Sequence, residues 1–155
     1  MAFKVTKWLP EDPAVLAAIG RIAVRHGQLN YCLRMTVKSL EGVSVGDALP
    51  GTEWEGSRKL SKRIKRIARA HFGDGDVLKW LEEILNRSRL VTERRNDLLH
   101  GLWCQKLDGE PGIRTDHEFQ AIPTIAELDD LANTLDQVTD DLNSARLKLP
   151  PKPIR

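Results

Sequence analysis

Residues 76–100 read DVLKWLEEILNRSRLVTERRNDLLH and contain neither proline nor glycine. Apolar residues recur in this stretch at spacings of three and four, which is the period of one face of an α-helix. Because proline and glycine are the residues that most disfavour helix interiors, nothing here interrupts a helix. We expect Asp74 or Asp76 to cap it and Gly101 to end it in the left-handed conformation. Its inward stripe reads Val77, Trp80/Leu81, Ile84, Ser88, Val91, Arg95 and Leu98.

Three more stretches have the same helical period. Each starts at residues typical of a helix N-terminus and stops at glycine or proline. They cover residues 12–41, 57–72 and 124–149, with starts at Asp12-Pro13, Ser57 and Thr124-x-x-Glu127 and stops at Gly42, Gly73 and Pro150. The chain is therefore predicted to be all-α, one domain over residues 1–155, built as a four-helix up-and-down bundle.

Residues 101–123 are too many for a bare connection between two helices of a compact domain. Two stretches that suit strands, 102–107 and 113–119, flank the turn formers Asp108-Gly109 and Pro111-Gly112. We therefore expect a small β-hairpin or irregular insertion between the third and fourth helices.

The composition sets limits on function. Of the 155 residues, 41% are hydrophobic and 30% charged, which excludes intrinsic disorder, and the net charge of +2 is far from that of a nucleic-acid coat protein. Cys32 and Cys104 lie far apart without metal-ligand spacing, so we expect no metal, no disulfide framework and a cytoplasmic location. No stretch suits a membrane span, and no motif for binding a nucleotide cofactor is present.

Charge is distributed unevenly along the chain. Residues 58–69 hold seven Lys and Arg and no acid, whereas residues 115–145 hold eight Asp and Glu and no Lys or Arg. One interpretation is that these helices pair with each other, within a chain or across a dimer. The other is that the basic helix binds a phosphate backbone, with Lys62, Arg63 and Arg66 as contacts.

Arg95 is anomalous because it falls in the middle of an apolar stripe. A guanidinium removed from water needs a partner or a solvated cleft, since burying a lone charge costs several kcal/mol. An ion pair with Asp136 or Asp140 of the last helix would satisfy this need. A groove that binds an anion would satisfy it equally, because the guanidinium fork suits phosphate.

His100 lies at the predicted end of the same helix, directly before Gly101. It could be a structural histidine that caps the last carbonyls of the helix. It could also exchange a proton near neutral pH, because the ordinary histidine pKa is about 6.5. The other three histidines are expected to be unreactive: His26 and His71 as satisfied, half-buried side chains, and His117 on the surface of the hairpin.

The motif Arg95-Asn96-Asp97-Leu98-Leu99-His100, near the end of a long third helix, resembles that of the HEPN superfamily. The resemblance implies a HEPN-like helical domain and a metal-independent endoribonuclease, toxin-like or of a defence system, with a composite cleft in a homodimer. By this resemblance His100 takes the proton of a ribose 2′-hydroxyl and Arg95 stabilises the phosphorane, while Asn96 and Glu93 lie on the helix face that orients His100. RNA is the implied partner, together with a cognate antitoxin or regulatory protein; no cofactor is implied.

Two points complicate this interpretation. On a straight helix Arg95 and His100 point about 140° apart, so we expect the helix to loosen at Leu99 or two chains to combine their residues. The HEPN toxins that are modified on a tyrosine carry it two residues after the histidine, where this chain has Leu102. A non-catalytic HEPN-like adaptor and an RNA-binding module that uses residues 58–69 remain as alternatives.

Overall fold

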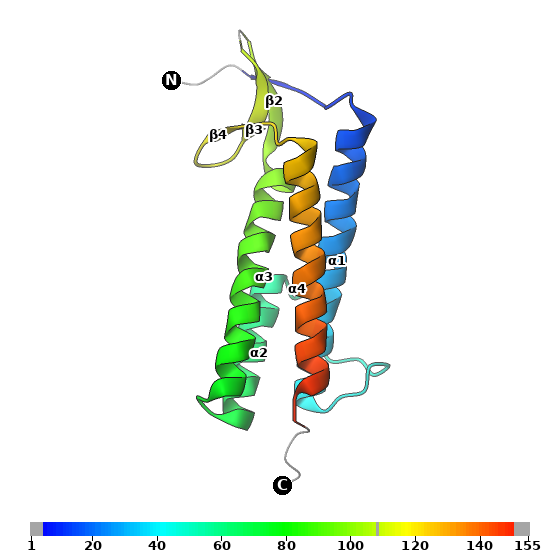
Figure 1. The fold of residues 1–155 in the computed structure, drawn as a ribbon, viewed down its shortest axis with the longest axis vertical. Helices are drawn as coiled ribbons and strands as arrows, with labels where there is room; N and C mark the ends of the chain where they lie inside the picture. Colours follow the sequence, from blue (N-terminus) through cyan, green and yellow to red (C-terminus); the bar gives the residue numbers. More distant parts are fainter. Residues whose placement is uncertain (1–4, 108, 151–155) are drawn as a thin grey trace.

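The structure, a computed structural model, describes residues 5–107 and 109–150. Four helices pack as a bundle, and a small antiparallel sheet lies at one end of it (Figure 1). This confirms the predicted four-helix bundle with a β insertion between the last two helices. The helices are α1 (Pro13–Glu41), α2 (Ser57–Phe72), α3 (Asp76–His100) and α4 (Ile125–Lys148). Asp108, Pro151 and Pro153, expected in a turn and in the stop after α4, lie outside the described residues.

The helix directions differ from a simple alternation. Arg21 bonds to Asp129 and Ser39 accepts from Arg146, so α1 and α4 run in the same direction. Ser57, at the start of α2, bonds to the middle of α1, and α2 descends from there beside it (Figure 1). Only α3 runs the opposite way. The physical reason is that residues 42–56 are enough to lead the chain back along α1 before α2 begins.

Two of the predicted helix starts are confirmed in detail. Asp12 Oδ1 accepts from the Ala14 N–H at 2.8 Å, ahead of the proline that begins α1. Thr124 and Glu127 form the predicted capping box of α4, with each side chain accepting from the other residue's N–H. These bonds satisfy donors that the first helical turn otherwise leaves unpaired.

The predicted stops at Gly42 and Gly73 are confirmed as C-caps, whereas the predicted N-caps of α2 and α3 and the left-handed conformation of Gly101 were wrong. Gly56 and Gly75 occupy the N-cap positions of α2 and α3, and no side chain caps either helix. Ser57 is instead the first residue of α2, where its hydroxyl donates to Asn30. Gly101 has an extended backbone, with φ −64° and ψ 149°, because the chain passes directly from α3 into a strand.

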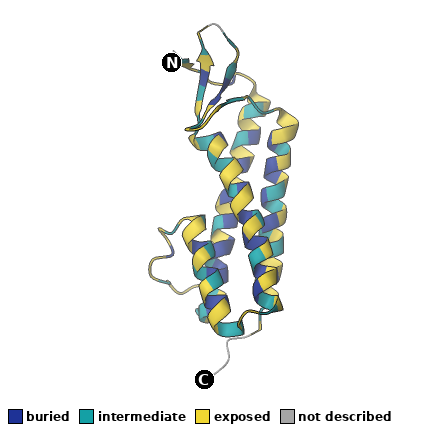
Figure 2. Cartoon of the chain, turned by 90° about the vertical axis from the view of Figure 1, so that its left-hand side faces the viewer, coloured by how far each residue is buried: buried dark blue, intermediate teal, exposed yellow. Residues whose placement is uncertain are grey.

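The core runs along the facing sides of the four helices (Figure 2). The predicted inward positions are largely those that are buried, since each stripe follows the helical period. The fully buried large side chains come from all four helices and one strand: Ile22, Leu29, Leu33, Leu60, Ile64, Leu81, Leu85, Ile113, Leu128, Leu135 and Leu142. Among the described residues, no helix combines the length and the apolar character that crossing a bilayer requires.

The insertion is larger than a hairpin. Strands β2 (Leu102–Lys106) and β3 (Pro111–Arg114) form the expected hairpin, and β4 (Phe119–Ala121) pairs with β3. The N-terminal strand β1 (Val5–Lys7) pairs with β2, which gives the order β1-β2-β3-β4. The sheet therefore ties the N-terminal segment to the end of α3, where His100 lies.

We predict that Gly101→Ala destabilises the protein by roughly 2 kcal/mol or more, because its Cβ would overlap the Ile113 side chain and the Asp97 carbonyl oxygen. Gly20→Ala in α1 is the matched control: nothing lies within 4 Å of its new Cβ, and alanine favours a helix interior by about 1 kcal/mol. Urea denaturation of both variants checks this. Equal stability of the two variants would contradict the packing described at Gly101.

Candidate active site

The candidate site lies beside the N-terminal end of α2. Ser57 Oγ donates to Asn30 Oδ1 at 2.8 Å, which fixes the start of α2 halfway along α1. Ser57 also shares a groove with Asn96 of α3. Helices α1 and α3 run in opposite directions. The residues that precede Asn30 in α1 and those that follow Asn96 in α3 therefore lie beyond the N-terminal end of α2. The part of the α1/α3 surface that contains His100 is therefore left uncovered by α2.

Arg95 and His100 meet within one chain. Arg95 Nη1 lies 3.3 Å from His100 Nε2 and donates to Asn96 Oδ1 at 3.0 Å. The expectation that the helix must loosen, or that two chains must combine, was wrong: α3 stays helical through His100. The long Arg95 side chain spans the turn and a half between the two residues, which a comparison of Cβ directions leaves out.

The expected ion pair of Arg95 with the last helix is not formed. Asp136 instead bonds to Arg25 of α1 at 2.7 Å, and among the described residues Arg95 has no carboxylate partner. Its Nε is buried without a hydrogen-bond partner. Burial lowers the pKa of Arg95 below its ordinary value, although a guanidinium remains charged at neutral pH. The site thus holds a half-buried cation, and none of the groups that contact it carries a negative charge.

His100 does not act as the cap of its helix in this structure. Trp103 Nε1 donates to the Leu98 carbonyl at 2.8 Å, and the Gly101 N–H donates to the Asp97 carbonyl. His100 is exposed, and its ring nitrogen faces Arg95. Since arginine only donates, a hydrogen bond at this contact requires an unprotonated Nε2, which is the form of the ring that can accept a proton.

His26 of α1 is the functional candidate that the sequence interpretation undervalued. It was expected to be half-buried and satisfied, but it is only 9% exposed and its Nε2 has no partner. Desolvation is the main cause that lowers its pKa to about 4, and the positive charge of Arg95, together with that of His100 in its protonated form, contributes to the same shift. The position of His26 on the α1 stripe was the one available signal; its closeness to the motif depends on how α1 packs on α3.

A groove of about 540 Å³ runs between α2 and α3 and ends at Asn96. Asn96 bonds to Arg95 rather than to His100, so it links the groove to the Arg95–His100 pair. Glu93 lies on the groove wall and pairs with Arg89 at 2.7 Å; its expected orienting role stays a prediction. The residues of α2 that line the groove include Arg58, Lys62 and Lys65.

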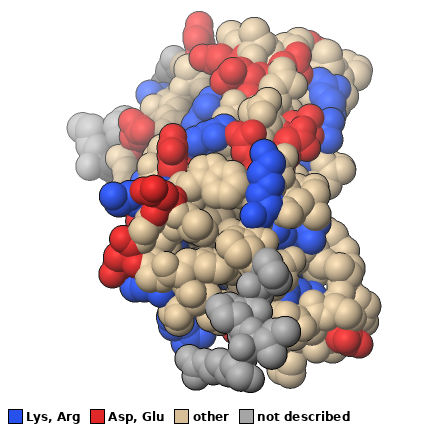
Figure 3. Space-filling model, turned by 60° about the horizontal axis from the view of Figure 1, so that its bottom comes forward, with Lys and Arg blue, Asp and Glu red and all other residues tan. Residues whose placement is uncertain are grey.

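The acidic helix α4 does not neutralise the basic helix α2. Acidic and basic side chains lie side by side on the face of the molecule that Figure 3 shows. The ion pairs of α4 are formed with α1 and α3. These pairs are Arg21–Asp129, Arg25–Asp136, Arg87–Asp141 and Arg94–Asp130. Within the described part of the chain the two oppositely charged helices therefore form no ion pair with each other, while their pairing across a dimer stays a prediction.

The basic residues of α2 are only partly paired. Arg63 lies 3.4 Å from Glu55, and Arg69 pairs with Asp74 and Glu82. Within residues 5–107 and 109–150, the other Lys and Arg of α2 form no ion pair, and these include the two predicted contacts Lys62 and Arg66. Arg63 is the predicted contact that is already engaged.

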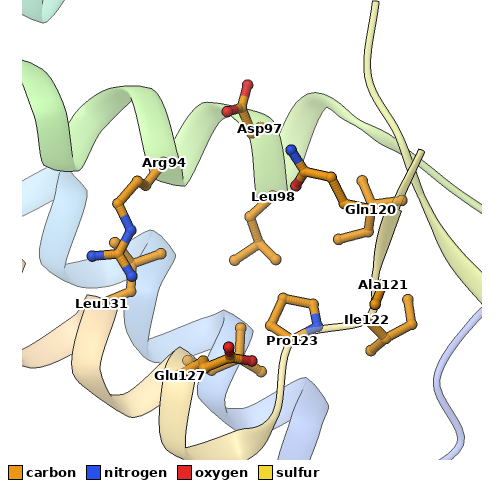
Figure 4. A pocket seen from close by; sticks show the side chains of 11 residues that line it. Arg94, Asp97, Leu98, Gln120, Ala121, Ile122, Pro123, Glu127 and Leu131 are labelled. Carbon is orange, nitrogen blue, oxygen red and sulfur yellow. The ribbon is translucent and has the colours of Figure 1, made fainter. Parts of the chain in front are cut away.

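A second pocket, of about 360 Å³, lies between α3, α4 and the segment that joins β4 to α4 (Figure 4). Its walls are mixed: Leu98 and Pro123 are apolar, while Arg94, Asp97 and Glu127 are charged. Neither Arg95 nor His100 lines it, so it is separate from the candidate site.

The described residues hold no group of three or more His, Cys, Asp or Glu side chains placed to bind a metal ion. Cys32 and Cys104 are buried and free. No protein-family model, no curated protein and no solved structure matches this chain.

We predict that His26 makes stability fall as the pH is lowered. The unfolded chain protonates His26 near pH 6.5 and the folded chain only near 4, so the unfolded state binds more protons between these values. The His26 contribution to this loss is about 3 kcal/mol between pH 7 and pH 4. His26→Gln lacks it, so urea denaturation of both proteins from pH 7 to pH 4.5 should show a shallower pH dependence for the variant. Parallel profiles would contradict a lowered pKa.

Proposed function

We propose that this chain is a metal-independent endoribonuclease of HEPN type that cuts RNA through the ribose 2′-hydroxyl. One observation carries the proposal: an exposed His100 touches Arg95, which has no carboxylate to neutralise it among the described residues. The chemistry needs a base that can accept a proton and a cation that can bind a phosphate. The resemblance of the residues 95–100 to the HEPN motif supports the same assignment.

In this mechanism the guanidinium of Arg95 leaves His100 Nε2 for the phosphate of the RNA, and the lone pair of Nε2 that this frees accepts the proton of the 2′-hydroxyl. The 2′-oxygen then attacks the adjacent phosphorus, and Arg95 stabilises the negative charge that develops on the phosphorane oxygens. The bond from phosphorus to the 5′-oxygen breaks, and the leaving oxygen takes back the proton that His100 received. The products are a 2′,3′-cyclic phosphate and a 5′-hydroxyl, and DNA is inert because it lacks the attacking group.

The groove between α2 and α3 supports a path for the RNA backbone. Lys62 and Lys65 line it, and its far end is Asn96, which bonds to Arg95. The first turn of α2 has no side-chain cap, so its N–H groups and the positive end of the helix dipole add to the positive potential there. A backbone bound along α2 would therefore lead to the pair that performs the cleavage.

The homodimer with a shared cleft and the cognate antitoxin or regulatory protein belong to the proposal on the resemblance alone. Since one chain brings Arg95 and His100 together, a second chain is not required to complete the pair. Its role in the proposal is to widen the cleft around the RNA.

We predict that His100→Ala lowers the rate of RNA cleavage roughly 100-fold or more, because it removes the base. His117→Ala is the matched control, since His117 lies exposed in the loop between β3 and β4. The assay uses a fluorescent single-stranded RNA with chelator present and resolves the cyclic phosphate end. A 2′-deoxy copy of the substrate is expected to stay intact.

Equal cleavage by wild type and His100→Ala, with circular dichroism showing both folded, would contradict the catalytic assignment. The non-catalytic adaptor is the outcome in which neither protein cleaves RNA and Arg95→Ala lowers the melting temperature alone. The absence of an ion pair between Arg95 and another helix argues against such a structural role.

RNA binding without turnover is the second candidate, and the unpaired lysines of α2 favour it. We predict that Lys62→Gln/Lys65→Gln weakens RNA binding on the order of tenfold and reduces the slope of log Kd against log salt by about 1.4, because each lost phosphate contact on a single strand removes about 0.7. Lys79→Gln/Lys148→Gln changes the net charge equally at exposed positions outside the groove and serves as the control. Fluorescence anisotropy between 50 and roughly 300 mM salt measures both effects. Equal losses in the two variants would indicate that α2 is not the binding surface.

A further inference from the structure

Trp54 is the most exposed large apolar side chain among the described residues. It lies in the segment that leads from α1 to α2, and 91% of it is open to solvent. The other tryptophans are covered at least in part: Trp8 and Trp103 stack on each other, and Trp80 is 37% exposed. An indole is a large apolar surface that folded proteins usually cover to a considerable extent. The surroundings of Trp54 indicate what covers it.

The chain holds Trp54 in place from both sides. Thr52 is buried, and its hydroxyl donates to the Leu49 carbonyl at 2.8 Å. On the other side, Glu55 lies 3.4 Å from Arg63 of α2. The backbone of Trp54 is thus fixed beside α2 by its neighbours, while its ring projects into solvent. A ring presented in this way loses little conformational freedom when a ligand covers it.

The surface next to Trp54 is positively charged. Glu55 and four cations of α2 line a hollow of about 320 Å³. The four cations are Lys59, Lys62, Arg63 and Arg66. Glu55 is the single acid of the hollow and pairs with Arg63, whereas the other three cations form no ion pair within residues 5–107 and 109–150. Charge complementarity therefore favours an anion in this hollow.

The hollow adjoins the groove that runs between α2 and α3. Lys62 lines both of them, so one lysine side chain separates the two. The groove ends at Asn96, which bonds to Arg95. A strand bound in the groove can therefore cross Lys62 and enter the hollow beside Trp54.

We propose that Trp54 and this hollow form a subsite for one unpaired nucleotide of the RNA. The base stacks on the face of the indole, and the adjacent phosphate lies in the hollow against Lys59 and Arg66. In a duplex the faces of a base are covered by the neighbouring base pairs, so the subsite selects single-stranded RNA. The combination of a flat apolar ring with unpaired cations favours a nucleotide over an apolar protein surface, which would leave the cations unpaired. The choice of RNA as the ligand rests on the proposed function, whereas the binding does not require cleavage.

Binding of a short, fluorescein-labelled 2′-O-methyl RNA to the full-length protein tests the subsite. This probe resists cleavage because its attacking hydroxyl is blocked, and fluorescence anisotropy measures its Kd. We expect Trp54→Leu to weaken binding of the single strand roughly tenfold, and Trp54→Phe to bind nearly as wild type because it keeps an aromatic face. Tyr31→Leu is the matched control, since Tyr31 is also exposed but lines a different groove. Wild-type affinity in Trp54→Leu, or an equal loss in Tyr31→Leu, would overturn the subsite.

Two further measurements separate stacking from general electrostatic attraction. Trp54→Leu removes no charge, so the slope of log Kd against log salt should equal that of wild type, whereas Lys59→Gln should reduce this slope by about 0.7. The same strand annealed to its complement should bind to Trp54→Leu and to wild type equally well. A loss of duplex binding in Trp54→Leu as large as its loss of single-strand binding would overturn the selection of unpaired nucleotides.

Failure of the subsite and failure of the proposed ribonuclease give different results. If wild type binds the 2′-O-methyl RNA through Trp54 but cleaves no RNA, the catalytic assignment fails and the subsite stands. If His100→Ala abolishes cleavage while Trp54→Leu binds RNA like wild type, the subsite fails and the catalytic assignment stands. If wild type binds no RNA, both fail, and the exposed indole is left for a protein partner.

Discussion

The structure depends on a guanidinium held at the edge of a leucine core by neutral groups. Val91 and Leu98 force one face of α3 inward, and Arg95, between them, is carried to the border of the core. Its bonds go to an amide oxygen and an imidazole nitrogen. Because no carboxylate among the described residues neutralises it, the desolvation cost of the cation remains in the folded state. Such a cost is typical of a site whose charge meets a partner outside the chain.

The course of the chain explains why this cation reaches solvent. Residues 42–56 lead back along α1, so α2 begins beside Asn30 and covers only part of the surface between α1 and α3. Had α2 followed α1 by a short turn and run its full length, the site would lie under a helix. The arginines of α1 and α3 form ion pairs with acidic residues of α4. Lys62 and Lys65, in the groove that ends at Asn96, are left without an ion pair among the described residues.

The sequence predicted the parts of the fold that depend on local pattern. The four helices follow from their apolar period, and Asp12 and Thr124 cap as expected because a cap is made within three residues. Strand β1 could not be found, since three residues are too short to show a strand period and their partner β2 is about a hundred residues away. The helix directions were also beyond reach, because a long connection permits either direction.

In the candidate site, too, the features that depend on local sequence pattern were predicted and those that depend on tertiary packing were not. Arg95 was found because a charge in an apolar stripe is visible in sequence, and His100 because it follows Arg95 at a motif spacing. Their contact was not foreseen, since it depends on the reach of a long side chain rather than on the direction of its Cβ. His26 was undervalued because a histidine on a stripe looks like any core residue until tertiary packing shows which of its nitrogens is left unpaired.

The neutrality of the groups around Arg95 has a chemical logic. A carboxylate would stabilise the folded chain more, but it would also compete with any anion for the guanidinium. Asn96, His100 and His26 orient or flank the cation without cancelling its charge. Four acidic residues of α4, among them Asp136, form ion pairs with arginines of α1 and α3, so they do not neutralise Arg95, although the net charge of the chain is only +2. Local placement of charge, rather than its total, thus determines what this surface attracts.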